Sequence, residues 1–162
     1  MKKRTSKKSP LIKSPKTFII SFLAVILIAA VGSMFTATSG WYQSVKPSIT
    51  PPNYVFPIAW TIIYILIALS IYLSWTSSDK KEKKSLTTWF SINLAANAIW
   101  NPIFFGLKMP TLALVDIAVI LISALVLIKL TWKINKTASW MLLPYIIWLI
   151  FTTLLNLLIV LA

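Results

Sequence analysis

Five long apolar runs constrain this chain more than any other feature of its sequence. They span Thr17–Thr38, Val55–Thr76, Leu86–Leu107, Thr111–Trp132 and Ala138–Leu161, and each is 22 to 24 residues long. A bilayer core of about 30 Å needs about 20 helical residues to cross it. Because lipid offers the backbone no hydrogen-bond partner, such runs form helices rather than open strands. The sequence therefore predicts an all-α fold, a polytopic membrane protein with a bundle of five transmembrane helices.

The composition excludes whole classes of function. Charged residues make up 12% of the chain, whereas a soluble domain carries about 25%, so a soluble enzyme is excluded. The chain has no histidine and no cysteine, which removes the usual general base, the usual haem ligand and any thiolate. The three acids, Asp79, Glu82 and Asp116, are too few for a carboxylate-rich metal cage. We therefore expect no metal site and no required cofactor.

The basic residues predict how the chain lies in the cell membrane. If the helices alternate, fourteen of the sixteen Lys and Arg fall on one side: seven in residues 1–16, four in Lys80–Lys84, and Lys129, Lys133 and Lys136. Lys46 and Lys108 fall on the other side. By the positive-inside rule the N-terminus is cytoplasmic, and the Ser39–Tyr54 loop and the C-terminus are extracellular.

The same charges bear on domains and partners. Residues 1–16 form a basic cytoplasmic tail that we expect to be disordered, and residues 17–162 form a single transmembrane domain. The basic charge is expected to attract anionic lipid headgroups. No basic face alternates with aromatic residues for base stacking, so we expect no nucleic-acid partner. Small residues at Ser91, Ala95 and Ala98 allow close helix approach and predict a homodimer.

Aromatic and polar residues at membrane depth predict a cavity. Polar side chains there should face the bundle interior. With the predicted topology, one set converges in the outer half: Trp60, Tyr64, Trp100, Asn101, Phe104, Asp116, Thr152 and Asn156, with Asn97 and Trp148 near the midplane. These residues predict an aromatic, hydrogen-bonding cavity beneath the Ser39–Tyr54 loop. The alternative is that the asparagines only bond helix to helix, at about 0.6 kcal/mol each.

Asp116 has two interpretations. An acid inside the membrane suggests a functional site. Asp116 also lies about one turn from the start of its helix, where the dipole stabilises negative charge. We favour the structural interpretation, in which Asp116 ties its helix to a neighbouring helix or loop.

A series of local motifs resembles a known family. The motifs are Trp41-Tyr42, Lys46-Pro47, Pro51-Pro52, Pro57-Ile58-Ala59-Trp60, Asn97 to Gly106, Ala113 to Asp116, Pro144-Tyr145, Trp148 and Leu155-Asn156. In this order they resemble bacterial-type members of the translocator protein family, also called tryptophan-rich sensory proteins or peripheral-type benzodiazepine receptors. The resemblance implies five transmembrane helices, a homodimer and a ligand cavity under the first long loop.

The resemblance also implies a function and a site. It implies a membrane receptor or sensor that binds a porphyrin (protoporphyrin or haem) and drug-like isoquinoline or benzodiazepine ligands. The motif match, with two aromatic residues from the same helix faces, gives these ligand-binding residues: Trp60, Tyr64, Asn97, Trp100, Asn101, Phe104, Trp148 and Thr152.

Two alternatives remain open at this point. The first is a light-dependent porphyrin-degrading enzyme, for which the resemblance implies Trp60 and Trp148 as catalytic residues. The lack of an acid–base pair weighs against an enzyme. The second is a porphyrin transporter, which would lack a visible energy source because the chain has no nucleotide-binding motif.

Overall fold

The structure is a computed structural model, and it describes residues 14–162. Every regular element in that range is helical, which confirms the all-α class for it. Five helices are long: α1 (Pro15–Phe35), α3 (Val55–Ser77), α4 (Lys80–Asn101), α5 (Pro110–Ile134) and α7 (Leu143–Leu161). Three elements are short: α2 (Trp41–Val45), the π-helical η1 (Pro102–Gly106) and α6 (Lys136–Trp140). Most of the predicted tail, residues 1–13, lies outside the described residues, and Pro15 and Lys16 already belong to α1.

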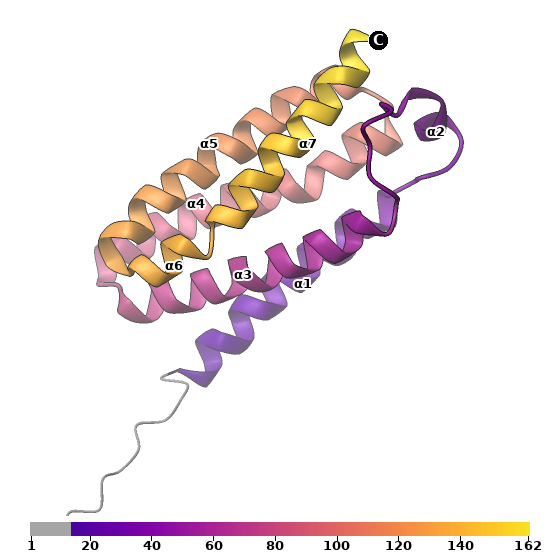
Figure 1. The fold of residues 1–162 in the computed structure, drawn as a ribbon. Helices are drawn as coiled ribbons and strands as arrows, with labels where there is room; N and C mark the ends of the chain where they lie inside the picture. The colour runs from indigo at the N-terminus through magenta and orange to yellow at the C-terminus, as the bar shows by residue number, and fades with distance from the viewer. Residues whose placement is uncertain (1–13) are drawn as a thin grey trace, which may run out of the picture.

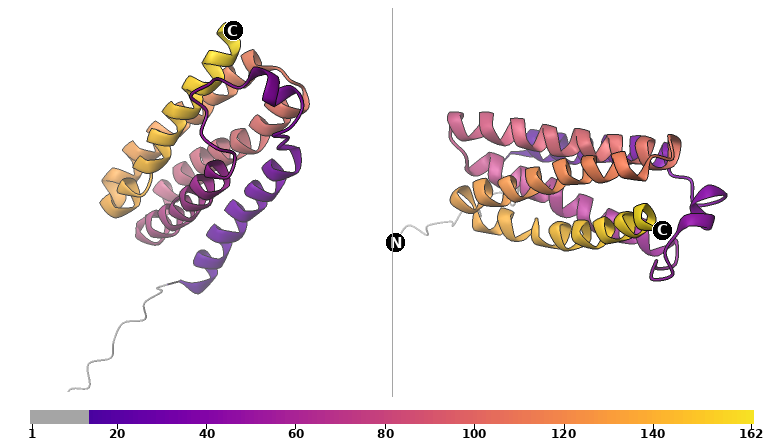
Figure 2. Two further views of the ribbon diagram at one scale, coloured as in Figure 1. Left: turned by 45° about the vertical axis from the view of Figure 1, so that its right-hand side comes forward. Right: turned by 90° about the horizontal axis from the view of Figure 1, so that it is seen from above.

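The long helices run side by side along one axis, and the chain reverses at each end (Figure 1). Figure 2 shows α2 and its loop at the same end as the C-terminus, here called the α2 end, and α6 at the opposite end, the α6 end. α1 packs against α3 and α4, α4 against α5, and α5 against α7. α3 packs against α6, whereas the backbones of α3 and α7 make few contacts. The bundle is therefore closed between α3 and α7 mainly by α6, at one end.

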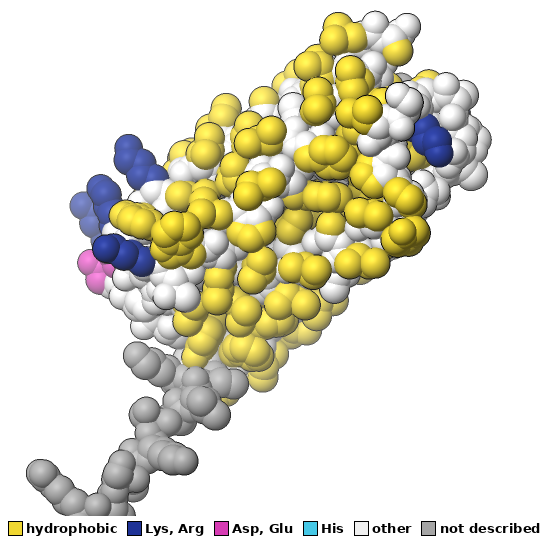
Figure 3. All heavy atoms as spheres, in the orientation of Figure 1, with side chains coloured by type: hydrophobic (Ala, Val, Ile, Leu, Met, Phe, Trp, Pro, Cys, Tyr) yellow, Lys and Arg dark blue, Asp and Glu magenta, His cyan; other side chains and the backbone are white. Residues whose placement is uncertain are grey.

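The surface and the hydropathy identify a multi-pass helical membrane protein. Four segments are long and apolar enough to cross a bilayer, with a mean hydropathy of 2.1 to 2.8: Pro15–Phe35, Val55–Ser77, Pro110–Ile134 and Lys136–Leu161. α4 is not among them, because four lysines and three asparagines lower its hydropathy. Figure 3 shows apolar side chains covering the middle of the visible face, with Lys and Arg confined to the two ends.

α4 begins six residues before the predicted span, at Lys80 instead of Leu86. The cause is a capping box. The Asp79 carboxylate accepts a hydrogen bond from the Glu82 N–H at 2.8 Å, and the Asp79 N–H donates to the Glu82 carboxylate at 2.9 Å. The segment Lys80–Lys84, which lies between two predicted spans, therefore forms the first turns of a helix.

Prolines reshape the ends of two predicted spans. At Pro102, which has no N–H to donate, α4 passes into the π-helix η1, where the Leu107 N–H bonds the Pro102 carbonyl at 2.9 Å. The predicted span Ala138–Leu161 is divided into α6 and α7 by a turn at Met141 and Leu142. Pro144 then sits in the first turn of α7, where a missing N–H costs nothing.

The α6 end is densely packed and its polar groups are paired. Ala68, Leu86, Leu127 and Leu142 are at most 1% exposed. The Ser70 hydroxyl donates across helices to the Ala138 carbonyl at 2.8 Å, and the Ser139 hydroxyl donates to the Ile128 carbonyl at 3.0 Å. These bonds fasten α6 to α3 and α5 without leaving a buried hydroxyl unsatisfied.

Candidate functional site

A cavity of about 510 Å³ opens between the five long helices toward the α2 end. Each long helix contributes to its wall, and the loop around α2 contributes Thr38, Tyr42 and Asn53. No charged side chain of the described residues lines it. Its size and its mostly apolar wall with a few polar groups are typical of small-molecule sites. The predicted cavity beneath the Ser39–Tyr54 loop is thus present.

One wall depends on the close approach of α1 to α4. Gly32 of α1 is buried, and a Cβ at that position would lie 2.8 Å from Nδ2 of Asn101. Just beyond it, the Thr36 hydroxyl donates to Oδ1 of Asn101 at 3.3 Å. The glycine therefore lets Asn101 fill the space between the two helices at the cavity edge.

Aromatic rings join the loop to the end of α4. The Trp100 ring stacks on Phe104, with centroids 4.6 Å apart and planes 14° apart. Phe104 also meets Trp41 and Tyr42 of α2 edge-on, at 5.6 and 6.2 Å, and Tyr42 meets Phe105 at 5.5 Å. Burial raises the pKa of Tyr42 above its ordinary value of 10.0. The π-helix presents two consecutive phenylalanines to these contacts.

The opposite wall carries Trp60 and Tyr64, one turn apart on α3. Their rings lie 5.3 Å apart, and Trp60 meets the buried ring of Tyr145 on α7 edge-on at 6.3 Å. Trp60 therefore bridges α3 and α7 where their backbones stay apart.

The deep end of the cavity is a hydrogen-bonded network across three helices. Asn97 of α4 lines the cavity, and its amide donates to the Tyr145 hydroxyl at 2.6 Å and to the Asn93 carbonyl at 2.8 Å. The Asn93 amide donates to the Ile120 carbonyl at 3.0 Å and to the Ser123 hydroxyl at 2.9 Å, and its Oδ1 accepts from Tyr145 at 3.1 Å. Here the alternative interpretation holds for Asn93, which bonds helix to helix, while Asn97 does so and also faces the cavity.

Seven of the eight predicted ligand-binding residues line the cavity. They are Trp60, Tyr64, Asn97, Trp100, Asn101, Phe104 and Thr152.

Trp148 is the exception. Its ring packs edge-on against Phe56 at 5.8 Å and lies 5.5 Å from Phe151, outside the cavity lining. Counting by three or four residues from Tyr145 to Thr152 allows either Trp148 or Leu149 to share their face, and in the structure Leu149 does. The expectation that Trp148 faces the cavity is therefore corrected.

Asn156 was grouped with the cavity by depth but was not assigned a ligand contact. It is 2% exposed, it lines the cavity, and neither atom of its amide has a hydrogen-bond partner among residues 14–162. Only the three-dimensional arrangement reveals this isolation, since depth and spacing alone give the position.

Asp116 does not line the cavity. Its Oδ2 is buried without a hydrogen-bond partner among the described residues. The expected tie from Asp116 to a neighbouring helix or loop is therefore absent from this part of the chain.

Comparison with known proteins covers nearly all of the described chain. The model of the TspO/MBR family matches residues 20–161. Tryptophan-rich protein TspO of Archaeoglobus fulgidus is 40% identical over 141 residues, which is 85% of this chain and 91% of that protein. Tryptophan-rich sensory protein of Cereibacter sphaeroides is 30% identical over 141 residues, 85% of each chain. The human Translocator protein is 34% identical over 139 residues, 83% of this chain and 82% of its own.

Proposed function

This chain belongs to the TspO/MBR family, and on that premise we propose that it is a receptor- or sensor-type membrane protein that binds a tetrapyrrole. The ligand is protoporphyrin or haem, held in the cavity between the helices, and isoquinoline or benzodiazepine-type compounds occupy the same place. The names of two relatives, a sensory protein and a translocator protein, support a role of this kind.

The cavity wall is the observation that carries this proposal. A porphyrin is a large flat apolar ring with two propionates. Trp60, Trp100 and Phe104 offer ring faces or edges of the kind that stack on such a ligand, each contact contributing about 0.5–1.5 kcal/mol beyond burial. Asn97 and Asn101 offer polar atoms. Since the chain holds neither histidine nor cysteine, the commonest protein ligands of haem iron, we expect metal-free porphyrin to bind about as well as haem.

We also propose that α4 is a fifth membrane span, shielded by its neighbours. Two of its asparagines, Asn93 and Asn97, are buried against α5 and α7, while Ile92 and Ile99 face outward. A helix of this kind satisfies its polar groups inside the protein and presents apolar side chains to lipid. The exposed Ser91 and Ala95 on the same helix support a homodimer through α4.

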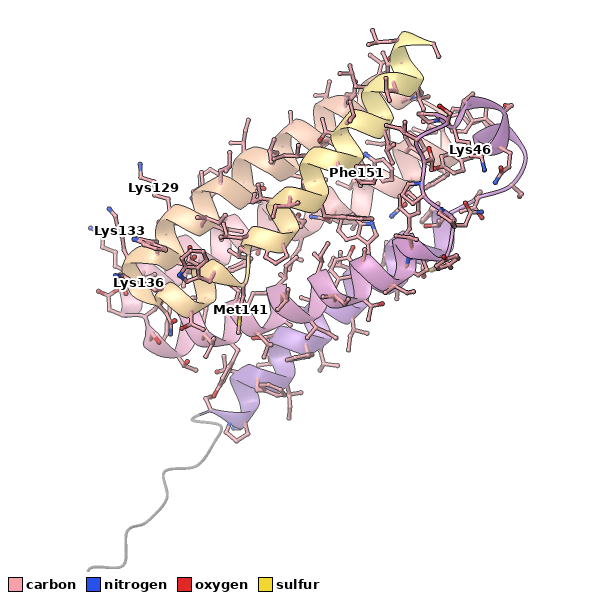
Figure 4. All side chains as sticks on the ribbon, viewed as in Figure 1. Lys46, Lys129, Lys133, Lys136, Met141 and Phe151 are labelled. Carbon is pink, nitrogen blue, oxygen red and sulfur yellow. The ribbon has the colours of Figure 1, made fainter. Side chains whose placement is uncertain are left out.

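The N-terminus is cytoplasmic and the α2 end is extracellular. Figure 4 places Lys129, Lys133 and Lys136 at the α6 end and Lys46 at the α2 end, which is the arrangement that the positive-inside rule requires. A cysteine replacing Ser48 should react with an impermeant maleimide in intact cells, whereas one replacing Ser85 should not. The reverse labelling would overturn this orientation.

Binding is tested with purified protein and protoporphyrin. Protein tryptophan fluorescence should fall in a saturable manner as the absorption band of the porphyrin shifts. A linear, non-saturating response equal to that of empty detergent micelles would contradict the proposal.

Light-dependent degradation of porphyrin by dioxygen is the second candidate. It is favoured by the position of Trp60, which is oxidisable, lines the cavity and adjoins the rings of Tyr64 and Tyr145. Illuminated Trp60→Phe protein should retain binding and lose degradation, because phenylalanine is much harder to oxidise. Trp148→Phe, outside the cavity, is the matched comparison. Wild-type protein that degrades porphyrin no faster than detergent alone would leave binding as the function.

A further inference from the structure

Two asparagines that are similarly buried in the bundle differ in their hydrogen bonding. Asn93 is 1% exposed and Asn156 is 2% exposed. The amide of Asn93 has partners for both its nitrogen and its oxygen, from the backbone and from three side chains. Asn156 has none among the described residues for either atom. Burying an amide without hydrogen bonds destabilises a folded protein, so a residue of this kind calls for a function.

The residues around Asn156 provide few groups that could form hydrogen bonds with its amide. One turn earlier on α7, the Thr152 hydroxyl already donates to the Leu149 carbonyl at 3.1 Å. Its other neighbours in the lining on α7, Leu155 and Ile159, are apolar. α5, which packs against α7, presents Ile117 and Ile120 to the cavity. Asn156 therefore lies in a mostly apolar part of the cavity lining, with a buried donor and a buried acceptor that no described residue satisfies.

A second buried donor belongs to the same wall. Trp100 lines the cavity, and its Nε1 is buried without an acceptor among the described residues. Phe104 stacks on one face of the indole, and the N–H gives Trp100 a polar group that no described residue satisfies. Two unsatisfied polar groups in one cavity point to a ligand that carries polar groups of its own.

We propose that Asn156 is the residue that recognises the polar edge of the ligand. A primary amide presents an N–H and a C=O side by side. Its complement is a group with one acceptor and one donor in the same arrangement: a protonated carboxyl or a cis-lactam. Both form two hydrogen bonds with Asn156 and leave no atom of the pair unsatisfied. The inference rests on the proposed function in that the cavity is taken as the ligand site.

The uncharged lining of the cavity favours a neutral ligand. No described lysine or arginine side chain lines the cavity to balance a carboxylate, and an unpaired charge is costly to bury. A carboxyl ligand therefore binds in its protonated form, and its affinity falls as the pH rises above the pKa of the free acid. A lactam ligand has no such dependence. The pH dependence of the affinity therefore distinguishes a carboxyl ligand from a lactam ligand.

The test compares Asn156→Leu with Asn93→Leu in the full-length protein. Probes are protoporphyrin, its dimethyl ester, and the small pair isoquinolin-1-one and isoquinoline, which differ by a lactam. Asn156→Leu should melt at the wild-type temperature or above, because it removes an unsatisfied amide. The affinity of Asn156→Leu for protoporphyrin or isoquinolin-1-one should fall about tenfold. Its affinity for the dimethyl ester and for isoquinoline should not change. Asn93→Leu should lower the melting temperature. Asn156→Ala removes the amide without adding volume and serves if the leucine variant does not fold.

Each other outcome has a distinct meaning. If Asn156→Leu melts lower, as Asn93→Leu does, Asn156 is a structural residue and the inference fails. Unchanged affinity for every probe would mean that a bound water satisfies the amide, which also overturns it. If wild-type protein binds isoquinolin-1-one through Asn156 but no tetrapyrrole, the proposed function fails and the recognition by Asn156 stands. If it binds none of the probes, both fail.

Discussion

The two ends of this bundle use the same kinds of residue for different purposes. At the α6 end, buried serines donate to carbonyls of neighbouring helices and small side chains fill the space. Toward the α2 end, Nε1 of Trp100 and the amide of Asn156 are buried with no hydrogen-bond partner among the described residues, around a cavity of about 510 Å³. Satisfied polar groups stabilise a membrane bundle, and unsatisfied ones give up stability for the capacity to bind. Substitutions at the first end should therefore change stability, and those at the second should change affinity.

The network between the two ends should give the largest effect. Tyr145→Phe removes a hydroxyl that accepts from Asn97 and donates to Asn93. The free energy of unfolding should fall by about 2 kcal/mol, measured by thermal or denaturant unfolding in detergent. Tyr54→Phe, at an exposed loop position, is the control and should have no effect. If the two variants were equally stable, the hydrogen-bonded network around Tyr145 would not contribute to stability.

The next largest effect concerns affinity. Trp100→Leu deletes the ring stacked on Phe104 at 4.6 Å and should weaken protoporphyrin binding about tenfold, or about 1.4 kcal/mol. Trp140→Leu replaces an exposed indole at the α6 end and should leave the fluorescence-quenching titration unchanged. If both variants bind alike, the aromatic wall is not where the ligand lies.

A smaller effect on stability is expected at the start of α4. Asp79→Ala removes the capping box and should destabilise the protein by about 1 kcal/mol. Asp79→Asn keeps a side-chain acceptor and should lose much less. Because the cap lies at the α6 end, neither variant should alter ligand affinity. A change in affinity without a change in stability would contradict the division between the two ends.

The smallest effect is expected at the contact between α1 and α4. A Cβ at Gly32 meets Nδ2 of Asn101 at 2.8 Å, so in Gly32→Ala the asparagine must turn away from Thr36. Affinity should fall by about 0.5 kcal/mol, roughly twofold, while the better helix propensity of alanine offsets the crowding. At Gly106 the nearest atom lies 3.9 Å away, so Gly106→Ala should bind as wild type does in the same titration.

The sequence predicted the class of fold and most of the cavity wall, for reasons that can be traced to particular residues. Apolar runs long enough to cross a bilayer predicted the helices, because length and hydropathy are local properties. The start of α4 could also have been predicted, since Asp79 and Glu82 have capping-box spacing. The lysines between the two predicted spans suggested a loop instead. The choice between Trp148 and Leu149 could not be predicted, because helical spacing permits either residue to face the cavity. The isolation of Asn156 depends on what faces it across the cavity, which no single helix encodes.

The hydrogen bond between α3 and α6 holds the start of α7 close to α3, so α7 would tilt about that end. The Ser70 hydroxyl donates to the Ala138 carbonyl, and the first two turns of α7 meet α3 through the ring pairs Phe56–Trp148 and Trp60–Tyr145. A helix of 19 residues is about 28 Å long. A tilt of about 2° at its fixed end would therefore carry the far end about 1 Å sideways. Such a tilt would widen the α2 end of the cavity for thicker ligands without breaking the hydrogen bond between Ser70 and Ala138.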